Sequence, residues 1–265
     1  MTLLSVRKLN IAFHNKPILK NVDFNIRQGE WFTLIGESGS GKSITASAIG
    51  GLLPGEMIIT SGSICFEDKD ITMLSNKEFR KLRGKEISFV FQDYQSSFTP
   101  FIKIGKQMDE MIQAHCQLTK EERREKALEA LEEVQLPAER VYDSYPFQLS
   151  GGQLQRASIA MAMMLKPKLL IADEPTTALD SITTIHVLEI MANMKKKMNC
   201  SILFITHDIR QAKKYSNTIG VMKQGEIVEI GTKETIMYHP SHPYTKLLLN
   251  AAPTIRRLDQ NIVLQ

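Results

Sequence analysis

Cysteine is scarce in this sequence and is not arranged to hold a metal ion. The three cysteines, Cys65, Cys116 and Cys200, stand far apart, and no two of them form a C-x-x-C pair. Neither a zinc knuckle nor a disulfide framework is therefore indicated, and this use of cysteine fits a reducing compartment.

Long apolar runs are also missing. The richest, IAMAMMLKPKLLIAD, is interrupted by Lys166 and Lys168 and falls short of the ~18 consecutive apolar residues that suggest a membrane-spanning helix. Near the start, Arg7 and Lys8 follow only a few apolar residues, which is not typical of a signal peptide. We therefore expect a soluble chain that can still dock on a membrane protein.

Charge of one sign is nowhere concentrated. The 33 basic and 29 acidic residues are interspersed, and the short run Lys195–Lys197 is typical of a solvated helix face. No basic stripe indicates a nucleic-acid surface, so we expect no nucleic-acid partner. With 43% hydrophobic residues, the 265-residue chain can build one large domain or two modest ones.

Short apolar runs alternate with longer helical patterns, which predicts an α/β domain with a largely parallel, buried sheet. Between Gln92 and Leu165 the strand signal vanishes, so we expect an inserted helical subdomain over about 93–165. The segments LLSVRKLNIAF and GSICFED predict a flanking antiparallel sheet. The expected parallel strands are Trp31–Ile35, Ile87–Phe91, Leu169–Ala172, Ser201–Thr206 and Thr218–Met222.

A glycine-rich loop follows the first of these strands. It matches G-x-x-x-x-G-K-[ST] between the strand WFTLI and the helical run SITASAIGGLL, which is the context of a Walker A loop. Its backbone N–H groups could surround the phosphates of ATP, Lys42 adds a positive charge, and the Ser43 hydroxyl could ligate Mg²⁺. A plain serine- and glycine-rich turn is the alternative. The predicted ATP-binding residues are Gly36, Glu37, Ser38, Gly39, Ser40, Gly41, Lys42 and Ser43.

Two adjacent carboxylates end the apolar strand LLIAD. We expect Asp173 to hold the Mg²⁺ shell and Glu174 to act as general base toward the attacking water. Such a pair is commonly a helix cap or a solvated turn, but the Walker A loop in the same chain favours the functional interpretation.

Two further polar residues end neighbouring strands. His207 closes ITHD, and a parallel sheet would bring it beside Glu174, within reach of the γ-phosphate. Gln92 ends ISFVFQ, and its amide could contact Mg²⁺ or the attacking water. Each residue alone is more often structural, so both predictions depend on the neighbouring motifs.

A second anion-binding pattern, Ser150-Gly151-Gly152, opens a helical run within YPFQLSGGQLQR. Free N–H groups at a helix N-terminus favour an anion. Because this stretch lies on the helical insert, away from the chain's own Walker A loop, we expect it to meet a phosphate presented by another subunit.

In their order and spacing, GESGSGKS, FQD, LSGGQLQR, LLIADEPTTALD and ITHD resemble the ATP-binding subunit of an ABC transporter over nearly the whole chain. The resemblance implies a P-loop NTPase (RecA-like) α/β core with the flanking antiparallel β subdomain and the inserted α-helical subdomain, in a single domain over 1–265. It also implies a head-to-tail dimer in which ATP lies between the Walker A loop of one subunit and the signature loop of the other. The residues that it adds are Ser150, Gly151, Gly152 and Gln153 in the signature loop, Phe13 stacking on adenine, and Asp180 in the dimer-contact loop. A core phenylalanine is the alternative for Phe13.

The C-terminal segment HPSHPYTKLLLNAAP resembles the tail, here about 232–265, of the peptide and nickel importer ATPases. His239 and His242 could suggest a metal site, but a proline-stiffened turn before a helix is favoured, because no carboxylate or cysteine cluster accompanies them. The stretches YPFQLSGGQLQR and SSFTP resemble nickel or metal-chelate importers more than oligopeptide importers.

Three residues depart from this branch in the region that would grip a permease. Tyr94 stands where proline is usual, and Phe98-Thr99 stands where Leu-Asn is common. We predict that Tyr94 and Phe98 are candidates for a permease-specific contact. A cysteine-rich tail is absent, so no iron–sulfur cluster is implied.

The resemblance implies an ATPase that energises import of nickel, metal chelates or peptides from the cytoplasmic face of the membrane. Its expected partners are a second ATP-binding subunit, with a heterodimer favoured over a homodimer, two permease subunits and, indirectly, a substrate-binding protein. The alternatives are a soluble ABC ATPase acting on ribosomes or DNA, and a regulatory ATPase.

Overall fold

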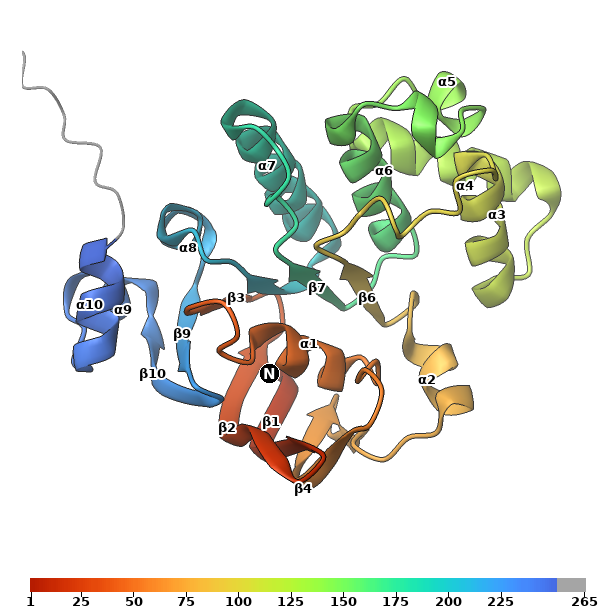
Figure 1. The fold of residues 1–265 in the computed structure, drawn as a ribbon. Helices are drawn as coiled ribbons and strands as arrows, with labels where there is room; N and C mark the ends of the chain where they lie inside the picture. The colour runs from red at the N-terminus through yellow and green to blue at the C-terminus, as the bar shows by residue number, and fades with distance from the viewer. Residues whose placement is uncertain (252–265) are drawn as a thin grey trace, which may run out of the picture.

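A computed structural model describes residues 1–251 and places a six-stranded sheet at the centre of the molecule (Figure 1). Its strands are β3 (Trp31–Ile35), β6 (Ile87–Val90), β7 (Leu169–Asp173), β8 (Ser201–Ile205), β9 (Thr218–Lys223) and β10 (Glu226–Thr232). The order is β10-β9-β3-β8-β7-β6, with only β10 antiparallel to its neighbour. All five predicted parallel strands are confirmed, and each ends within one residue of the expected position.

A smaller antiparallel sheet flanks this core, as predicted. It has the order β2-β1-β4-β5, with bounds β1 (Thr2–Phe13), β2 (Lys16–Arg27), β4 (Met57–Phe66) and β5 (Lys69–Asp70). The sequence analysis missed β2, which joins β1 through a reversal at His14 and Asn15, both with positive φ. Buried Leu19, Val22 and Phe24 carry the signal that could have shown it, although a shift in register disturbs their alternation.

Helices cover both faces of the central sheet (Figure 1). Helix α1 (Lys42–Ile49) lies on the face toward the antiparallel sheet, where Phe32 and Ile205 point, whereas Trp31 and Phe204 point to the opposite face. This alternation follows from the two-residue period of a strand. The other helices outside the insert are α2 (Asn76–Leu82), α7 (Ser181–Met198), α8 (Ile209–Tyr215), α9 (Lys233–Tyr238) and α10 (Pro243–Ala251).

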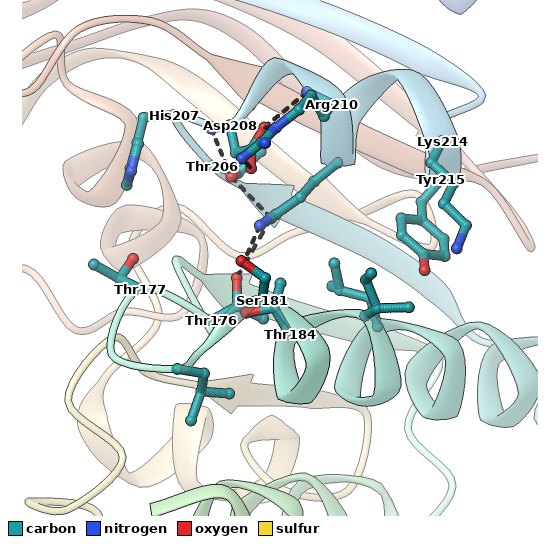
Figure 2. Close-up of a pocket in the computed structure, with 14 residues that line it drawn as sticks. Thr176, Thr177, Ser181, Thr184, Thr206, His207, Asp208, Arg210, Lys214 and Tyr215 are labelled. Carbon is teal, nitrogen blue, oxygen red and sulfur yellow. Dashed lines mark hydrogen bonds and ion pairs between the residues drawn. The ribbon is translucent and has the colours of Figure 1, made fainter. Parts of the chain in front are cut away.

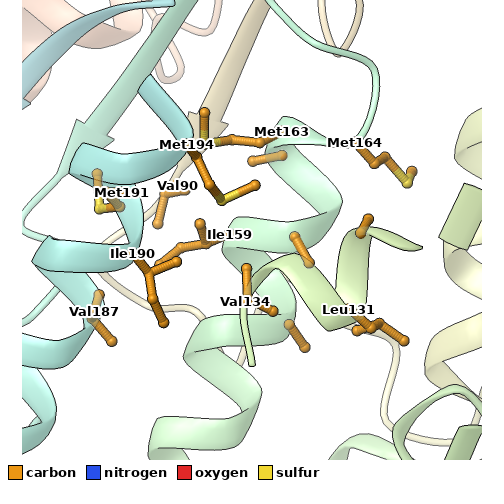
Figure 3. Packing of buried hydrophobic residues seen from close by; sticks show 14 of the residues in the cluster. Val90, Leu131, Val134, Ile159, Met163, Met164, Val187, Ile190, Met191 and Met194 are labelled. Atoms are coloured by element: carbon orange, nitrogen blue, oxygen red, sulfur yellow. The ribbon is translucent and has the colours of Figure 1, made fainter. Parts of the chain in front are cut away.

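The segment predicted to be helical, 93–165, contains α3 (Ile104–His115), α4 (Lys120–Glu133), α5 (Ala138–Tyr142), a 3₁₀ turn (Pro146–Gln148) and α6 (Gly151–Met163). Figure 3 shows how Ile159 and Met163 of α6 pack between Leu131 of α4 and Ile190 of α7. The insert therefore shares its apolar core with a helix of the central domain.

Tyr94 and Phe98 belong to this same core and expose only 4% and 3% of their surface. Their burial contradicts the prediction that these side chains contact a permease. Phe101, three residues further on, is 84% exposed. The predicted tail extends to residue 265, but residues 252–265 lie outside the described part of the chain. Within residues 1–251, no helix combines the length and hydropathy needed to cross a bilayer.

Candidate nucleotide-binding site

Three loops meet where the parallel strands end. Asp173 of β7 pairs with Ile205 of β8, and Ile205 pairs with Leu34 of β3 on its other side. The residues that follow these strands therefore share one edge of the sheet, as expected for a doubly wound fold. At this edge the Glu174 N–H also donates to the Ile205 carbonyl oxygen at 2.9 Å.

The Gly36–Ser43 loop curls around the lysine that it contains. Lys42 Nζ donates to the carbonyl oxygens of Gly36 (2.9 Å) and Glu37 (2.8 Å), and the residue is only 5% exposed. Burial lowers the pKa of Lys42, while the nearby carboxylates oppose that shift. Gly36 adopts φ 151°, and a Cβ there would lie 2.2 Å from the Met222 carbonyl oxygen, so only glycine fits.

Helix α1 begins inside this loop without a side chain that caps it. Its N-cap residue is Gly41, with φ 105°, so no side-chain oxygen occupies the first N–H groups of the helix. Those groups carry the positive end of the helix dipole and can bind an anion.

Ser43 and Asp173 form a pair of oxygen ligands beside this loop. The Ser43 hydroxyl donates to Asp173 Oδ1 at 3.0 Å, and burial is the main reason that the pKa of Asp173 is raised. A hydroxyl and a carboxylate oxygen are hard ligands of the kind that Mg²⁺ prefers, with water completing its octahedron. The residues present therefore fit a magnesium ion.

Donors from three segments converge on one oxygen of Glu174. Its Oε2 accepts from Thr177 Oγ1 at 2.9 Å and from Gln92 Nε2 at 3.4 Å, and lies 3.2 Å from His207 Nδ1. Glu174 itself has φ 45°, an unusual conformation for a residue with a side chain. Such a conformation costs about 1–2 kcal/mol, which is consistent with a functional site that needs the carboxylate in one orientation.

Glu174, Gln92 and His207 line an open pocket of about 640 Å³ together with residues of the Gly36–Ser43 loop. It brings together most of the predicted Walker A residues with the predicted general base, the histidine and the glutamine. The lining residues are Ile18, Ser38, Gly39, Gly41, Lys42, Ser43, Ile44, Gln92, Glu174 and His207.

The signature loop lies elsewhere, on the insert, and none of its residues lines this pocket within the described chain. Ser150 Oγ accepts from the Gln153 N–H at 3.3 Å, and Gln153 Oε1 accepts from the Ser150 N–H at 3.0 Å. This capping box occupies both side chains at the start of α6. Gln153 is thus placed as a helix cap, a role that the sequence prediction did not include.

Within residues 1–251, the lining of this pocket also leaves out six other predicted residues, which are Gly36, Glu37, Ser40, Asp173, Phe13 and Asp180. Phe13, at the end of β1, is 38% exposed and has its ring against His14, so it is not a core phenylalanine. Asp180 caps α7 by accepting the N–H groups of Ile182 and Thr183, and its hydrogen bonds with Thr183 lower its pKa. Ile18 and Ile44 are the apolar pocket residues that the sequence analysis missed.

A second pocket, of about 370 Å³, opens between α7 and α8 next to His207 (Figure 2). Gln211 of α8 lines this pocket, and its side-chain amide contacts two other segments. Its Nε2 donates to Thr176 Oγ1 at 3.2 Å, and its Oε1 accepts from Thr206 Oγ1 at 3.1 Å. Gln211 thereby connects the loop that follows Glu174 to the strand end that carries His207, and the sequence analysis did not find it.

Comparison with known proteins gives two family matches. Residues 19–177 match the ABC transporter family, and residues 228–264 match the C-terminal region of oligopeptide and dipeptide transporters. The chain is 43% identical to the metal-staphylopine import system ATP-binding protein CntD of Staphylococcus aureus (strain NCTC 8325 / PS 47), over 96% of this chain and 95% of that protein. It is 44% identical to the oligopeptide transport ATP-binding protein OppD of Bacillus subtilis (strain 168), over 96% of this chain and 72% of that protein.

A solved structure shares the fold. The ATP-binding cassette MJ0796, seen as a dimer in a post-hydrolysis state with ADP and Pi, is 31% identical with a TM-score of 0.77. The match covers 87% of this chain and 99% of that cassette.

Proposed function

Because the chain belongs to the ABC transporter family and is an ATPase of that family, we propose that it is the ATP-hydrolysing subunit of a metal-chelate importer. The observation that carries the proposal is the pocket where the Gly36–Ser43 loop, Glu174 and His207 meet. A phosphate-binding loop with a positioned carboxylate and histidine is suited to hydrolysis of a phosphoanhydride.

The chain's own residues supply the phosphate-binding groups and the base for the chemical step. Lys42 and the N-terminus of α1 bind and orient the phosphates. Glu174 accepts a proton from the attacking water while the oxygen of that water bonds to the γ-phosphorus. The bond between the γ-phosphorus and the oxygen that bridges it to the β-phosphate breaks, which leaves ADP and phosphate. His207 and Gln92, both on Glu174 Oε2, hold the carboxylate and the water in line.

Magnesium is the metal that this site suits. Ser43 and Asp173 would hold it, with Gln92 as a further oxygen ligand. A bound Mg²⁺ offsets the charge of the phosphates.

The signature loop completes the site of a second ATP-binding subunit. Ser150, Gly151 and Gly152 lie at the N-terminus of α6, outside the chain's own pocket. In a head-to-tail dimer this terminus would face the γ-phosphate held by the partner. Asp180 at the start of α7 would lie in the dimer contact, and Phe13, exposed at the end of β1, would stack on adenine. We favour a heterodimer.

The dimer would bind two permease subunits at the cytoplasmic face of the membrane and receive cargo through a substrate-binding protein. A metal chelate is favoured because the similarity to the metal-staphylopine system spans nearly the full length of both chains. A peptide is the second candidate, because the oligopeptide relative is equally similar in identity and the C-terminal family match carries its name.

The test is uptake of radiolabelled nickel, with and without a chelator, and of a labelled peptide, in cells that carry the chain or its Lys42→Ala form. Lys196→Ala, on the exposed face of α7, is the matched control. We expect Lys42→Ala to abolish nickel–chelate uptake and to spare peptide uptake.

The other outcomes separate the alternatives. Loss of peptide uptake alone would overturn the metal proposal and leave the importer standing. Normal uptake of both, with ATP hydrolysis lost, would overturn the importer proposal in favour of a regulatory ATPase.

A further inference from the structure

The C-terminal helix contacts the phosphate-binding loop through one tyrosine. Tyr244, in the first turn of α10, accepts a hydrogen bond on its hydroxyl from the Glu37 N–H at 3.2 Å. The residue is 5% exposed and packs with Ile35, Val221 and Ile236, while Lys223 Nζ lies 4.7 Å from the ring centroid. Packing and this cation–π contact therefore fix the position of the hydroxyl.

The peptide group that joins Gly36 to Glu37 is held from both sides. Its N–H, that of Glu37, donates to Tyr244, and its carbonyl oxygen, that of Gly36, accepts from Lys42 Nζ at 2.9 Å. The carbonyl oxygen of the next peptide group, that of Glu37, also accepts from Lys42 Nζ at 2.8 Å. A single hydrogen-bonded peptide unit thus connects the tyrosine to the lysine of the loop, although 202 residues separate Lys42 and Tyr244 in sequence.

The start of α10 is itself anchored to the central sheet. Glu229 of β10 accepts from the N–H groups of Ser241 (2.7 Å) and His242 (3.2 Å), and His242 Nδ1 accepts from the Tyr244 N–H at 3.1 Å. Burial alone would raise the pKa of Glu229, but the nearby Thr245 hydroxyl together with these hydrogen bonds outweighs it and lowers the pKa to about 2. An ionised, well-bonded carboxylate therefore holds the turn that presents Tyr244.

We propose that Tyr244 is a positioning residue for the phosphate-binding loop, through which the C-terminal segment sets the affinity for ATP. This inference rests on the proposed role of Gly36–Ser43 in binding ATP. Without the hydroxyl, the Glu37 N–H loses its partner, so the peptide group between Gly36 and Glu37 can rotate and release the Gly36 carbonyl that Lys42 contacts. A loop that samples other conformations must be ordered again when ATP binds, and this ordering lowers affinity.

The test compares Tyr244→Phe with Tyr238→Phe in the full chain. Tyr238 lies on α9 in the same segment, is 61% exposed, and interacts with Lys213 through its ring, which phenylalanine keeps. The measurements are the Kd of a fluorescent ATP analogue, KM and kcat for ATP hydrolysis, and the urea midpoint of unfolding.

We expect Tyr244→Phe to raise the Kd and KM for ATP by roughly 2- to 10-fold, the range that follows from loss of one hydrogen bond. We expect kcat to change by less than about 2-fold, because the hydroxyl does not contact the reacting atoms. Tyr238→Phe should match the wild type in every measurement.

An unchanged Kd for Tyr244→Phe would overturn the inference. If the urea midpoint were lowered at the same time, the tyrosine would be merely structural. Lys42→Ala separates this failure from failure of the proposed function. If Lys42→Ala binds the analogue as the wild type does, the ATP-binding role of the loop is wrong. If Lys42→Ala weakens binding and Tyr244→Phe leaves the Kd unchanged, only the positioning role of Tyr244 is wrong.

Discussion

Replacing Gly151 with alanine would press a methyl group against the hydroxyl of a buried tyrosine. A Cβ at this position would lie 2.8 Å from Tyr94 Oη, while the next atom, Tyr94 Cζ, would lie at an ordinary 3.9 Å. Tyr94 is 4% exposed in the core of the insert and has little room to move. The whole conflict therefore comes from one oxygen atom, which the substitution Tyr94→Phe removes.

The expected magnitude follows from two opposing effects. Overpacking a well-packed site costs about 1–3 kcal/mol, whereas replacing glycine by alanine in a compatible conformation stabilises a protein by about 0.4–1 kcal/mol. Gly151 is the first residue of α6 and has no positive φ, so it is compatible. We expect Gly151→Ala to destabilise the wild type, to stabilise the Tyr94→Phe protein slightly, and to show a coupling free energy of about 1–3 kcal/mol between the two sites.

The assay is urea unfolding of the wild type, both single variants and the double variant. Gly231→Ala is the control, because Gly231 lies at another site and a Cβ there would be 3.4 Å from its nearest atom. Gly231→Ala should change the free energy of unfolding equally in the wild type and in the Tyr94→Phe protein. If Gly151→Ala also has the same effect with tyrosine or phenylalanine at position 94, the contact between Tyr94 and the signature loop is refuted.

Two further predictions concern carboxylates. Glu174→Gln keeps the shape of the side chain but removes the base, so we expect ATP binding to persist and hydrolysis to slow by ~10²- to 10⁴-fold; single-turnover hydrolysis near the wild-type rate would contradict the assignment. Glu229 has its pKa lowered from 4.5 to about 2, so its contribution is present above pH 4.5 and is lost as the pH falls toward 2. Because Glu229 is partly exposed, we expect Glu229→Gln to cost only about 1 kcal/mol in the free energy of unfolding at pH 7 and progressively less below pH 4.5; an equal cost at pH 7 and pH 3 would refute this.

Much of the candidate site is readable in the sequence because its parts are local. The Gly36–Ser43 loop is one continuous motif between a strand and a helix, and its residue types alone indicate phosphate. Asp173 and His207 each end an apolar run, and parallel strands place such ends at one edge of the sheet. The sheet pairing of Asp173 with Ile205 brings these residues together as that pattern implies.

Contacts between distant segments were not readable in this way. Tyr94 and Phe98 lie in a segment without periodicity, and only the packing of the insert shows that both are buried. Gln211 carries no motif of its own, and its role depends on Thr176, 35 residues away in the chain.

By itself, the sequence determined the α/β class, the central strands, the phosphate-binding loop and the family, because local periodicity and contiguous motifs encode them. The tertiary structure decided which groups touch Glu174, what lies against Gly151, and that Tyr244 reaches Glu37. Those contacts depend on how helices and sheets pack, and side-chain packing is a property of the whole core that no short stretch of residues specifies.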